Sequence, residues 1–539
     1  MKPQAQPTLE AVFRIPTVER EIGGSPPIFG DEMHRDNRPH AVVIGAGLGG
    51  LSTAIHLLRD GWRVSLLEKN ERCGGRMNVI EEAGFRIDMG PTLLMMPEVI
   101  ESIFTVCGRN MHDYLDIRRL DPAYRVRFTD GSAIDMRSSV EEMQREATRI
   151  APNEANSIAP LFRAMQKQYE NARFNFIEKP FNGYTSLLRP QTVAGMAKAM
   201  PLKSVYNFVA KYVKDERLRQ AFTFQTLYLG ISPYDCPSIY ALLPYIEMQF
   251  GVWFPMGGMT EIANALETLF FEMGGELHLN TSVNRILTQG GRACGVQIDC
   301  FRGLRDHPIY ADVVVANVDV PTAYTRLLPK SLIKKNTAEV LERKDYGCSG
   351  FLLYLGIKGL DSDFYHHEVL LSDNYEQTLG AITEQKVIPD DPAIYTCIPT
   401  RTDPTLAPEG HDVLYILVPC PHLGGEVDWE QEAPKLREKV LDKLERAGMK
   451  NLRSKIVFER QFNPNDFARH YGCFKGSAFG LAPLFFQSAC FRPQMRSEDV
   501  EGLYFTGAGT HPGGGVPIVL TSGRLAAETI AGDRSRLLR

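Results

Sequence analysis

The sequence of 539 residues lacks several features that assign a chain to a special class. It contains no run of about eighteen apolar residues, so we expect no transmembrane helix. Its ten cysteines form no C-x-x-C pair, which gives no indication of a metal site or a disulfide framework and favours a reducing, cytoplasmic compartment. The net charge of −5 gives no reason to expect a nucleic-acid partner.

The length and composition are those of a globular protein with more than one core. Hydrophobic residues make up 44% of the chain and charged residues 23%, which is ordinary for a folded protein. A chain of 539 residues exceeds one hydrophobic core, so two or three intertwined domains are expected. Residues 1–37 contain Pro-Pro and Gly-Gly pairs but no apolar signal core, and we expect a flexible tail there.

The stretch between residues 41 and 76 has the pattern of a dinucleotide-binding turn. The apolar run 41–44 predicts a buried parallel strand, and Gly45, Gly47 and Gly50 follow it at the spacing G-x-G-x-x-G. The first glycine permits a tight turn, the second lets backbone approach a pyrophosphate, and the third lets the next helix pack closely. A second strand, 64–67, ends in Glu68, which is placed to accept hydrogen bonds from ribose hydroxyls.

Two further loops favour a larger cofactor than NAD. Gly75 and Arg76 follow Glu68 closely, and the segment GFRIDMGPT puts Gly90 into another loop. Near the end of the chain, a strand at 502–506 runs into a glycine-rich loop and then a helix from about Val516. The free N–H groups and the positive dipole end of that helix would stabilise negative charge on a bound cofactor.

The strands of this nucleotide-binding sheet are expected to come from separated segments. The alternating stretch 277–283 and the apolar stretch 312–317 both predict strands that return to it. A hairpin is predicted across the Asp-Gly turn at 130–131. Strands at 351–357 and 413–419 and a helix at 432–447 are expected in a second domain.

The segment after Pro201 has two faces at helical spacing. An apolar face and a cationic face can place a helix in a membrane interface, and an ordinary surface helix covering its own core is an equal alternative. The neighbouring stretch 192–200, with one charge, favours the membrane slightly. The apolar face contains Leu202, Val205, Tyr206, Val209, Tyr212 and Val213, and the cationic face contains Lys203, Lys211 and Lys214.

The pair His366 and His367 is more typical of surface imidazoles than of a metal site. No further ligand stands at a useful spacing from it in the sequence. We therefore expect no metal there.

Taken together, these motifs resemble those of the bacterial and fungal phytoene desaturases, including the diapophytoene desaturases, which share a flavin-binding fold with the flavin amine oxidases. The resemblance covers nearly all of residues 40–532. Its most specific parts are VIGAGLGGL at 43–51, LLEKNERCGGR at 66–76, GFRIDMGPT at 84–92, GVWFPMGGM at 251–259, FKGSAFGL at 474–481, QSACFRPQ at 487–494 and GAGTHPGGGVP at 507–517.

The resemblance implies an α/β fold with α+β insertions and a Rossmann-like FAD-binding domain in discontinuous segments, 38–130, 250–320 and 485–539. A mixed-sheet substrate domain would comprise 131–175, 220–249 and 321–484, and a helical, membrane-associating region would comprise 176–219. The expected FAD-binding residues are Gly45, Ala46, Gly47, Gly49, Gly50, Glu68, Lys69, Gly75, Arg76, Gly90, Pro91, Thr92, Val283, Gly507, Ala508, Gly515 and Val516.

The implied reaction is desaturation of a linear C30 or C40 polyene, with hydride transfer to flavin and loss of a proton. A hydrocarbon offers no polar handle, so we expect a long apolar tunnel walled by the stretches 240–254 and 479–486, including Trp253, Phe254 and Phe479. The growing polyene stabilises an allylic cation, so a strong protein base is not required. If an acid or base is used, His511 and Glu247 are the candidates.

The resemblance also implies a membrane surface as a partner and oxygen or a quinone as the electron acceptor. Several related activities stay open. They are a later-acting carotenoid oxidase or 3,4-desaturase, a carotenoid isomerase, an amine oxidase, and a non-enzymatic carrier of prenyl chains.

Overall fold

The computed structural model describes residues 37–181, 193–195, 203–301 and 304–537. Contacts divide the chain into Met1–Arg38 and Pro39–Arg539, and all the elements below belong to the second unit. The predicted tail at 1–37 lies almost wholly outside the described residues, as does most of the apolar stretch 192–200.

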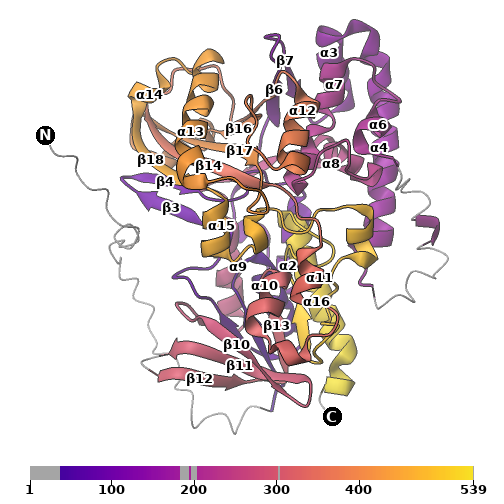
Figure 1. The fold of residues 1–539 in the computed structure, drawn as a ribbon, viewed down its shortest axis with the longest axis vertical. Coiled ribbons are helices and arrows are strands. Elements are labelled where there is room, and N and C mark those ends of the chain that lie inside the picture. Colours follow the sequence, from indigo (N-terminus) through magenta and orange to yellow (C-terminus); the bar gives the residue numbers. More distant parts are fainter. Residues whose placement is uncertain (1–36, 182–192, 196–202, 302–303, 538–539) are drawn as a thin grey trace, which may run out of the picture. The chain divides into compact units, whose positions relative to one another are not determined.

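A five-stranded parallel sheet is assembled from segments far apart in the sequence (Figure 1). Its β1 is buried at every position and apolar at all but His40, as expected for a strand covered on both faces. In spatial order the strands are β19 (Leu503–Phe505), β13 (Val313–Ala316), β1 (His40–Ile44), β2 (Arg63–Leu67) and β9 (Glu276–His278). The predicted assembly of one nucleotide-binding sheet from separated segments is confirmed.

One predicted strand of this sheet is in fact divided between two sheets. The stretch 277–283 breaks at Asn280, which takes a left-handed backbone conformation (φ 51°). Residues before the break form β9, and Val283 begins a strand of a separate antiparallel sheet. That sheet contains β10 (Val283–Gln289), β11 (Arg292–Phe301) and β12 (Leu304–Tyr310).

Helices cover the parallel sheet. Helix α1 (Leu48–Arg59) begins directly after the glycine turn and packs against α16 (Val516–Leu537) and α9 (Thr260–Glu272). The approach is close, because a Cβ at Gly523 of α16 would lie 2.5 Å from the Ser52 Cβ. Helix α2 (Pro97–Val106) packs against α1 and α16.

A seven-stranded mixed sheet forms the other half of this unit (Figure 1). Its order is β18 (Ile456–Phe462), β14 (Ser349–Lys358), β17 (His411–Cys420), β16 (Ile394–Cys397), β15 (His367–Leu370), β6 (Tyr124–Arg127) and β7 (Ala133–Met136). The predicted hairpin is therefore present, but it belongs to this sheet. The expected boundary at residue 130 cuts through the hairpin, so it is wrong and has to lie before Tyr124.

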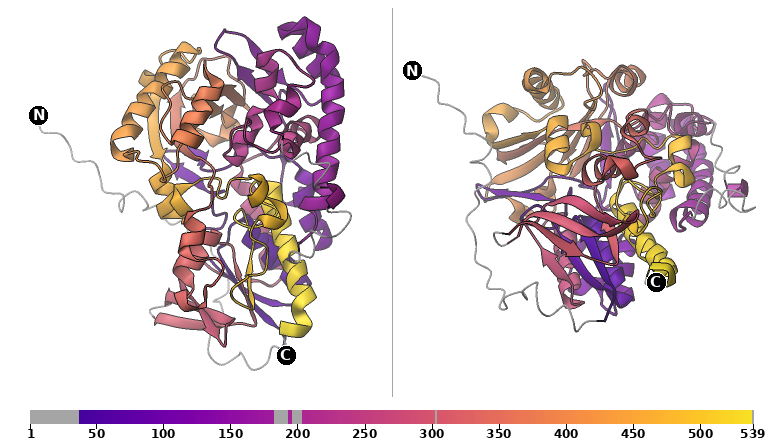
Figure 2. Two further views of the ribbon diagram at one scale, coloured as in Figure 1. Left: turned by 45° about the vertical axis from the view of Figure 1, so that its right-hand side comes forward. Right: turned by 60° about the horizontal axis from the view of Figure 1, so that its bottom comes forward.

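Helices stand on both sides of the seven-stranded sheet (Figure 2). The predicted helix near the C-terminal third is α13 (Trp429–Arg446), whose Trp429 ring stacks on Phe351 of β14. A second helical layer packs around α4 and α8. It contains α3 (Val140–Ile150), α4 (Ile158–Ala172), α6 (Val205–Val209), α7 (Glu216–Ala221) and α8 (Leu242–Phe250).

Short elements connect these layers. They are β3 (Val79–Glu82), β4 (Phe85–Asp88), β5 (Ile117–Arg119), β8 (Trp253–Pro255), α10 (Val320–Thr322), α11 (Ala338–Glu342), α12 (Tyr375–Gly380), α14 (Leu452–Lys455) and α15 (Pro464–Tyr471).

In the two-faced segment after Pro201, Leu202 lies outside the described residues, and the rest of the apolar face is buried or, at Tyr206 and Tyr212, half-buried. Val205, Val209 and Val213 are fully buried in the protein core, and the helix α6 ends at Val209. The lipid-facing interpretation of this face is therefore wrong, because the segment covers its own core. The cationic face is exposed at Lys203 and Lys211. Among the described residues, no helix combines the length and the apolar character needed to cross a bilayer.

Candidate functional site

A cavity of about 770 Å³ joins the two halves of the fold. At one end it reaches the loops that follow β1 and β2. At the other end it is walled by side chains of β14, β15, β16 and β17 and of the helical layer. The two ends differ in chemistry, so we describe them separately.

The glycine turn after β1 forms the floor of the first end. Gly45 has φ 92°, and a Cβ there would lie 2.9 Å from the Asn317 carbonyl oxygen, so only glycine fits. Gly47 is the N-cap of α1 and offers no side chain to cap it. The first amide groups of α1 are consequently available to a bound anion such as a pyrophosphate.

Glu68 is held rigidly at the tip of β2. One carboxylate oxygen accepts a hydrogen bond from the Ala46 amide at 2.8 Å, and the other accepts from the Asn70 amide at 3.0 Å. The Asn70 side-chain amide also donates to Oε1, at 2.8 Å, so Oε2 is the oxygen that keeps a lone pair for a ribose hydroxyl. Lys69 also lines the cavity, where its ammonium donates to the His470 carbonyl oxygen at 2.6 Å.

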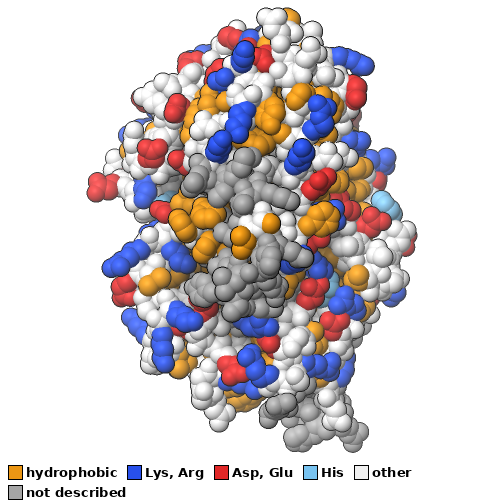
Figure 3. Space-filling model, turned by 90° about the vertical axis from the view of Figure 1, so that its right-hand side faces the viewer, with side chains coloured by type: hydrophobic (Ala, Val, Ile, Leu, Met, Phe, Trp, Pro, Cys, Tyr) orange, Lys and Arg blue, Asp and Glu red, His pale blue; other side chains and the backbone are white. Residues whose placement is uncertain are grey.

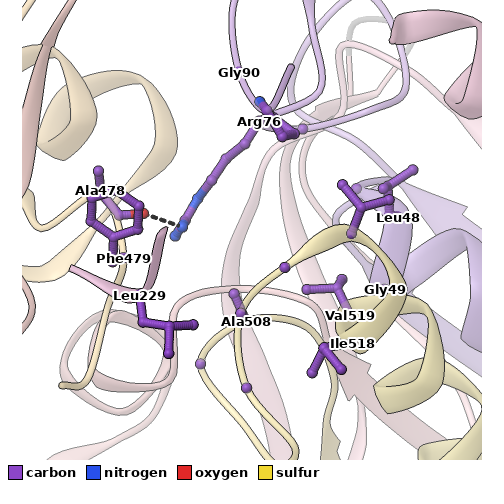
Figure 4. Close-up of a pocket in the computed structure, with 18 of the residues that line it drawn as sticks. Leu48, Gly49, Arg76, Gly90, Leu229, Ala478, Phe479, Ala508, Ile518 and Val519 are labelled. Atoms are coloured by element: carbon purple, nitrogen blue, oxygen red, sulfur yellow. Dashed lines mark hydrogen bonds between the residues drawn. The ribbon is translucent and has the colours of Figure 1, made fainter. Parts of the chain in front are cut away.

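Arg76 crosses the middle of the cavity wall (Figure 4). Its guanidinium Nη1 donates to the Ala478 carbonyl oxygen at 2.7 Å, next to Phe479. Gly90 lies against the Arg76 backbone so closely that a Cβ there would be 1.9 Å from the Arg76 carbonyl oxygen. Pro91 contributes to the same stretch of wall.

The glycine-rich loop before α16 completes this end. Ala508, Gly515 and Val516 line the cavity, and α16 begins at Val516 as predicted. The buried Arg492 donates to the Ala508 carbonyl oxygen at 2.8 Å and to the Thr510 carbonyl oxygen at 3.2 Å. Arg492 lies within the motif at 487–494, but the sequence did not indicate that its side chain holds this loop.

Most of the predicted cofactor residues meet at this end. Ala46, Gly50 and Gly507 do not line the cavity but support the loops from behind: a Cβ at Gly50 would lie 2.0 Å from the Gly45 carbonyl oxygen. The predicted residues that line it are Gly45, Gly47, Gly49, Glu68, Lys69, Gly75, Arg76, Gly90, Pro91, Thr92, Val283, Ala508, Gly515 and Val516.

The second end of the cavity is mainly apolar. Phe479 lines it as predicted, whereas Trp253 and Phe254 do not. Both belong to β8, which pairs with β5, and Phe254 packs edge-on against the His366 ring at 4.7 Å. The side chains that form this wall include Phe224, Leu227, Tyr228, Leu243, Ile246, Leu352, Val369, Tyr395, Leu417 and Phe485.

His511 lies at the cavity wall and is fully buried. Its Nε2 hydrogen-bonds to the Lys179 carbonyl oxygen at 3.1 Å, and Nδ1 has no partner. Burial lowers the pKa of His511 to about 4, so the imidazole is neutral near pH 7.

Glu247 lies one layer behind the apolar wall, on α8. Its Oε2 accepts hydrogen bonds from the Tyr124 hydroxyl at 2.5 Å and from the Gln225 amide at 3.2 Å. Burial raises the pKa of Glu247 to about 7. The neighbouring Tyr228 does line the cavity, and burial together with the Glu247 charge raises the pKa of its hydroxyl well above the usual value.

His366 and His367 are not surface residues, contrary to the expectation. They are 6% and 0% exposed, and β16 brings Cys397 directly opposite His367. The sequence hides this arrangement, because the third residue is thirty positions away and reaches the pair only through strand pairing.

Comparisons with known proteins agree with this geometry. Residues 48–531 match the family described as flavin containing amine oxidoreductase. The chain is 40% identical to a zeta-carotene-forming phytoene desaturase of Myxococcus xanthus, over 91% of this chain and 93% of the relative. It is 36% identical to a 4,4'-diapophytoene desaturase (4,4'-diaponeurosporene-forming) of Staphylococcus aureus, over 92% and 99%. An oxidoreductase from Methanosarcina mazei shares the fold, with a TM-score of 0.62, 20% identity and coverage of 91% and 100%.

The residues at the first end of the cavity fit FAD, the cofactor of this family. The glycine turn and the α1 N-terminus suit the pyrophosphate, Glu68 suits the ribose, and the α16 N-terminus suits the flavin ring. The chain belongs to the flavin containing amine oxidoreductases and, within them, to the phytoene and diapophytoene desaturase family.

Proposed function

We propose that this protein is an FAD-dependent carotenoid desaturase that introduces conjugated double bonds into a linear C30 or C40 polyene. The observation that carries the proposal is one continuous cavity with a dinucleotide-binding end and an apolar end. A soluble amine would need polar partners at the second end. Aliphatic and aromatic side chains dominate there instead.

The apolar wall binds the substrate by burial and shape. Leu227, Leu352 and Leu417 come from three different elements and face the same cavity. Burying apolar surface contributes about 25 cal/mol per Å², so a long polyene gains affinity along its whole length. The wall orients one carbon–carbon bond of the chain beside the flavin and excludes water from it.

Bound FAD supplies the two-electron oxidation by accepting a hydride from one carbon of the substrate. The adjacent carbon must then release a proton, and a new double bond forms between them. We assign the proton to Glu247, which lies behind Tyr228 of the cavity wall and whose Oε1 makes no hydrogen bond with any described residue. A carboxyl with a pKa near 7 is well matched to accepting a proton at neutral pH. His511, with a pKa of about 4, is the weaker base.

Glu247→Gln tests this assignment, because it preserves shape and removes the proton acceptor. Turnover should fall about 100-fold while FAD content stays unchanged. His511→Gln is the comparison, and we expect a smaller loss from it. Near-normal turnover of Glu247→Gln would remove Glu247 from the mechanism without touching the proposed reaction.

The reaction itself is tested with FAD-reconstituted protein and liposomes that contain either phytoene or diapophytoene. A new visible polyene spectrum from one of them, with the product identified by chromatography, would establish desaturation and set the chain length. If neither substrate changes while the flavin is bound and reducible, a later-acting carotenoid oxidase, an isomerase or an amine oxidase takes its place.

A membrane surface is the proposed source of the substrate. Figure 3 shows hydrophobic side chains gathered across the middle of one face, with Lys and Arg around them. Phe174 and Phe486 are 55% and 75% exposed, and their chain neighbours Phe176 and Phe485 line the cavity. A bilayer that covers these exposed rings would therefore lie one residue layer from the cavity.

Liposome flotation tests the membrane proposal. Phe486→Asp should weaken binding to anionic vesicles at least fivefold, because a carboxylate replaces an inserted ring. Val340→Asp is the matched control, since Val340 is also exposed (42%) but belongs to α11. Equal binding of both variants and the wild-type protein would contradict the proposal.

Oxygen and a membrane quinone are the two proposed electron acceptors. Photoreduced protein mixed with oxygen, or anaerobically with a quinone in liposomes, should recover the oxidised flavin spectrum with one of them at a rate matching turnover. Recovery slower than turnover with both would exclude both.

A further inference from the structure

A cluster of three buried side chains lies behind the cavity and does not line it. His367 of β15 stands directly opposite Cys397 of β16 in the antiparallel pair. The Ile398 amide donates to the His366 carbonyl oxygen at 2.7 Å, which fixes His366 beside them. One ring nitrogen of each histidine and the Cys397 sulfur all lie within 4.8 Å of one another. It is the one group of this kind among the residues that the structure describes.

The two imidazole rings are oriented as metal ligands are. The Nδ1 of His366 hydrogen-bonds to the Thr402 hydroxyl at 2.6 Å, and the Nδ1 of His367 to the Tyr395 hydroxyl at 2.8 Å. In metal sites a second partner of this kind fixes the ring and leaves the other nitrogen for the ion. In both His366 and His367, Nδ1 is hydrogen-bonded to a hydroxyl and Nε2 makes no hydrogen bond.

The remaining nitrogens have no protein partner. Nε2 of His366 and Nε2 of His367 are both buried and make no hydrogen bond. A buried polar atom without a hydrogen bond destabilises the folded protein, so two such atoms on neighbouring residues call for an explanation. A metal ion bound to both nitrogens and to the Cys397 sulfur would satisfy them at once.

We propose that His366, His367 and Cys397 form a buried, three-coordinate site for a cuprous ion. Metal–ligand bonds of roughly 2.0–2.3 Å require the three donors to draw together by about 1 Å. On binding, the Cys397 thiol releases its proton and forms a copper–sulfur bond; no electron is transferred.

Charge and coordination number select copper over zinc. A cuprous ion with one thiolate and two neutral imidazoles is uncharged, whereas a zinc ion would leave one positive charge in the protein interior. Zinc also prefers four ligands, and the described residues provide three. Thiolate and imidazole suit monovalent copper. The nearby Asp88 is half-buried and already engaged, because it accepts from the Met259 amide at 2.7 Å and the Thr260 amide at 3.1 Å.

The site is connected to the cavity by hydrogen bonds. The Tyr395 hydroxyl forms hydrogen bonds with His367 Nδ1 and, at 2.5 Å, with the Thr92 hydroxyl. Both Tyr395 and Thr92 line the cavity. An ion at His367 would therefore fix the Tyr395 side chain at the junction of the cofactor end and the apolar end.

The test is an anaerobic titration of the FAD-loaded full chain with cuprous ion, in competition with bicinchoninate, after alkylation of exposed thiols. The wild-type protein should hold one copper per chain and show thiolate-to-copper absorption in the near ultraviolet. Cys397→Ser should bind at least 100-fold more weakly. Cys420→Ser is the matched control, because Cys420 is a buried thiol of the same sheet outside the cluster, and it should bind like wild type.

Copper bound equally by wild type and Cys397→Ser, or no copper in the wild type, would overturn the proposal. Retention of zinc in place of copper would overturn the choice of ion. X-ray absorption at the copper edge of the wild-type protein gives a second measurement that needs no variant. It should show one sulfur and two nitrogen neighbours, and a sulfur-free shell would contradict the site.

Discussion

The two ends of the cavity are built on opposite principles. The cofactor end uses backbone amides, glycines and a few fixed charges such as Glu68 and Arg76. The substrate end uses apolar side chains such as Leu352 and Leu417, contributed by the seven-stranded sheet. Atom positions at the first end must match a charged ligand, so few residues are tolerated. The second end needs only volume and apolar surface, which many sequences provide.

The first prediction compares two glycines with similar backbone conformations. Gly45 has φ 92° and Gly61 has φ 82°, but a Cβ at Gly45 would meet the Asn317 carbonyl oxygen at 2.9 Å, whereas nothing lies within 4 Å at Gly61. Alanine strains both backbones by about 1–2 kcal/mol. Gly45→Ala should also displace the turn and lower FAD affinity at least ~100-fold, about 2.7 kcal/mol.

Flavin fluorescence during equilibrium dialysis measures this difference. Gly61→Ala should keep FAD affinity within about threefold of wild type. Equal losses from both variants would mean that general strain, and not the contact with Asn317, sets the affinity.

The second prediction concerns Glu247, whose carboxyl lies behind the apolar end. Burial raises the pKa of Glu247 from 4.5 to about 7. The folded protein therefore keeps a proton that the unfolded chain releases above pH 4.5, and stability falls as pH rises from 4.5 to 7. The shift corresponds to about 3 kcal/mol. Glu247→Gln has no proton to lose, so its Tm should rise relative to wild type between pH 5 and pH 7.5.

Thermal unfolding at the two pH values checks this. Glu430→Gln on the exposed face of α13 is the control, and its Tm difference from wild type should not change with pH. Parallel pH profiles for Glu247→Gln and wild type would show that Glu247 is ionised at no cost to stability.

The third prediction places a polar group in the substrate wall. Leu227 lines the cavity and is half-buried. Asparagine has nearly the same shape as leucine, but its amide would face hydrocarbon without a partner, at about 1–3 kcal/mol. Leu227→Asn should raise KM for the polyene about 10-fold with FAD affinity unchanged. Leu227→Met, which stays apolar, should change KM less than about threefold. If Leu227→Asn also lowered FAD affinity about 10-fold, the cofactor end and the substrate end of the cavity would not be independent.

The difference between the cofactor end and the substrate end of the cavity also explains which residues could be predicted from the sequence. The glycine turn, Glu68 and the start of α16 were predictable, because a charged dinucleotide demands those residue types at fixed spacings. The parallel sheet was largely predictable because its strands β1, β2, β13 and β19 consist mainly of apolar residues, whereas β9 has the sequence Glu-Leu-His. The break at Asn280 was missed, since an alternating pattern continues through it and a single left-handed residue leaves no periodic signal.

Other site residues carry no sequence signal because their position depends on tertiary packing. Arg492 acts through carbonyl oxygens, which every residue has. Trp253 and Phe254 have the composition of a tunnel wall, but pairing of β8 with β5 keeps them out of the cavity. The pair His366 and His367 was expected at the surface because no further ligand stands at a useful spacing in the sequence, and its burial becomes visible only when β15 pairs with β16.

The last prediction concerns what holds the two halves together. The Arg460 guanidinium of β18 lies 2.7 and 2.8 Å from the two carboxylate oxygens of Glu82 in β3, but the side chains are 36% and 45% exposed. Such a pair contributes about 0–1 kcal/mol and weakens with salt. Arg460→Gln should therefore lower the unfolding free energy by less than about 1 kcal/mol, with no effect in 1 M salt. Beside it, Phe85 fits against Gly356, where a Cβ would lie 2.5 Å from the ring. Because that contact is buried and complementary, the junction of the halves is apolar. A loss above ~2 kcal/mol from Arg460→Gln would contradict this view.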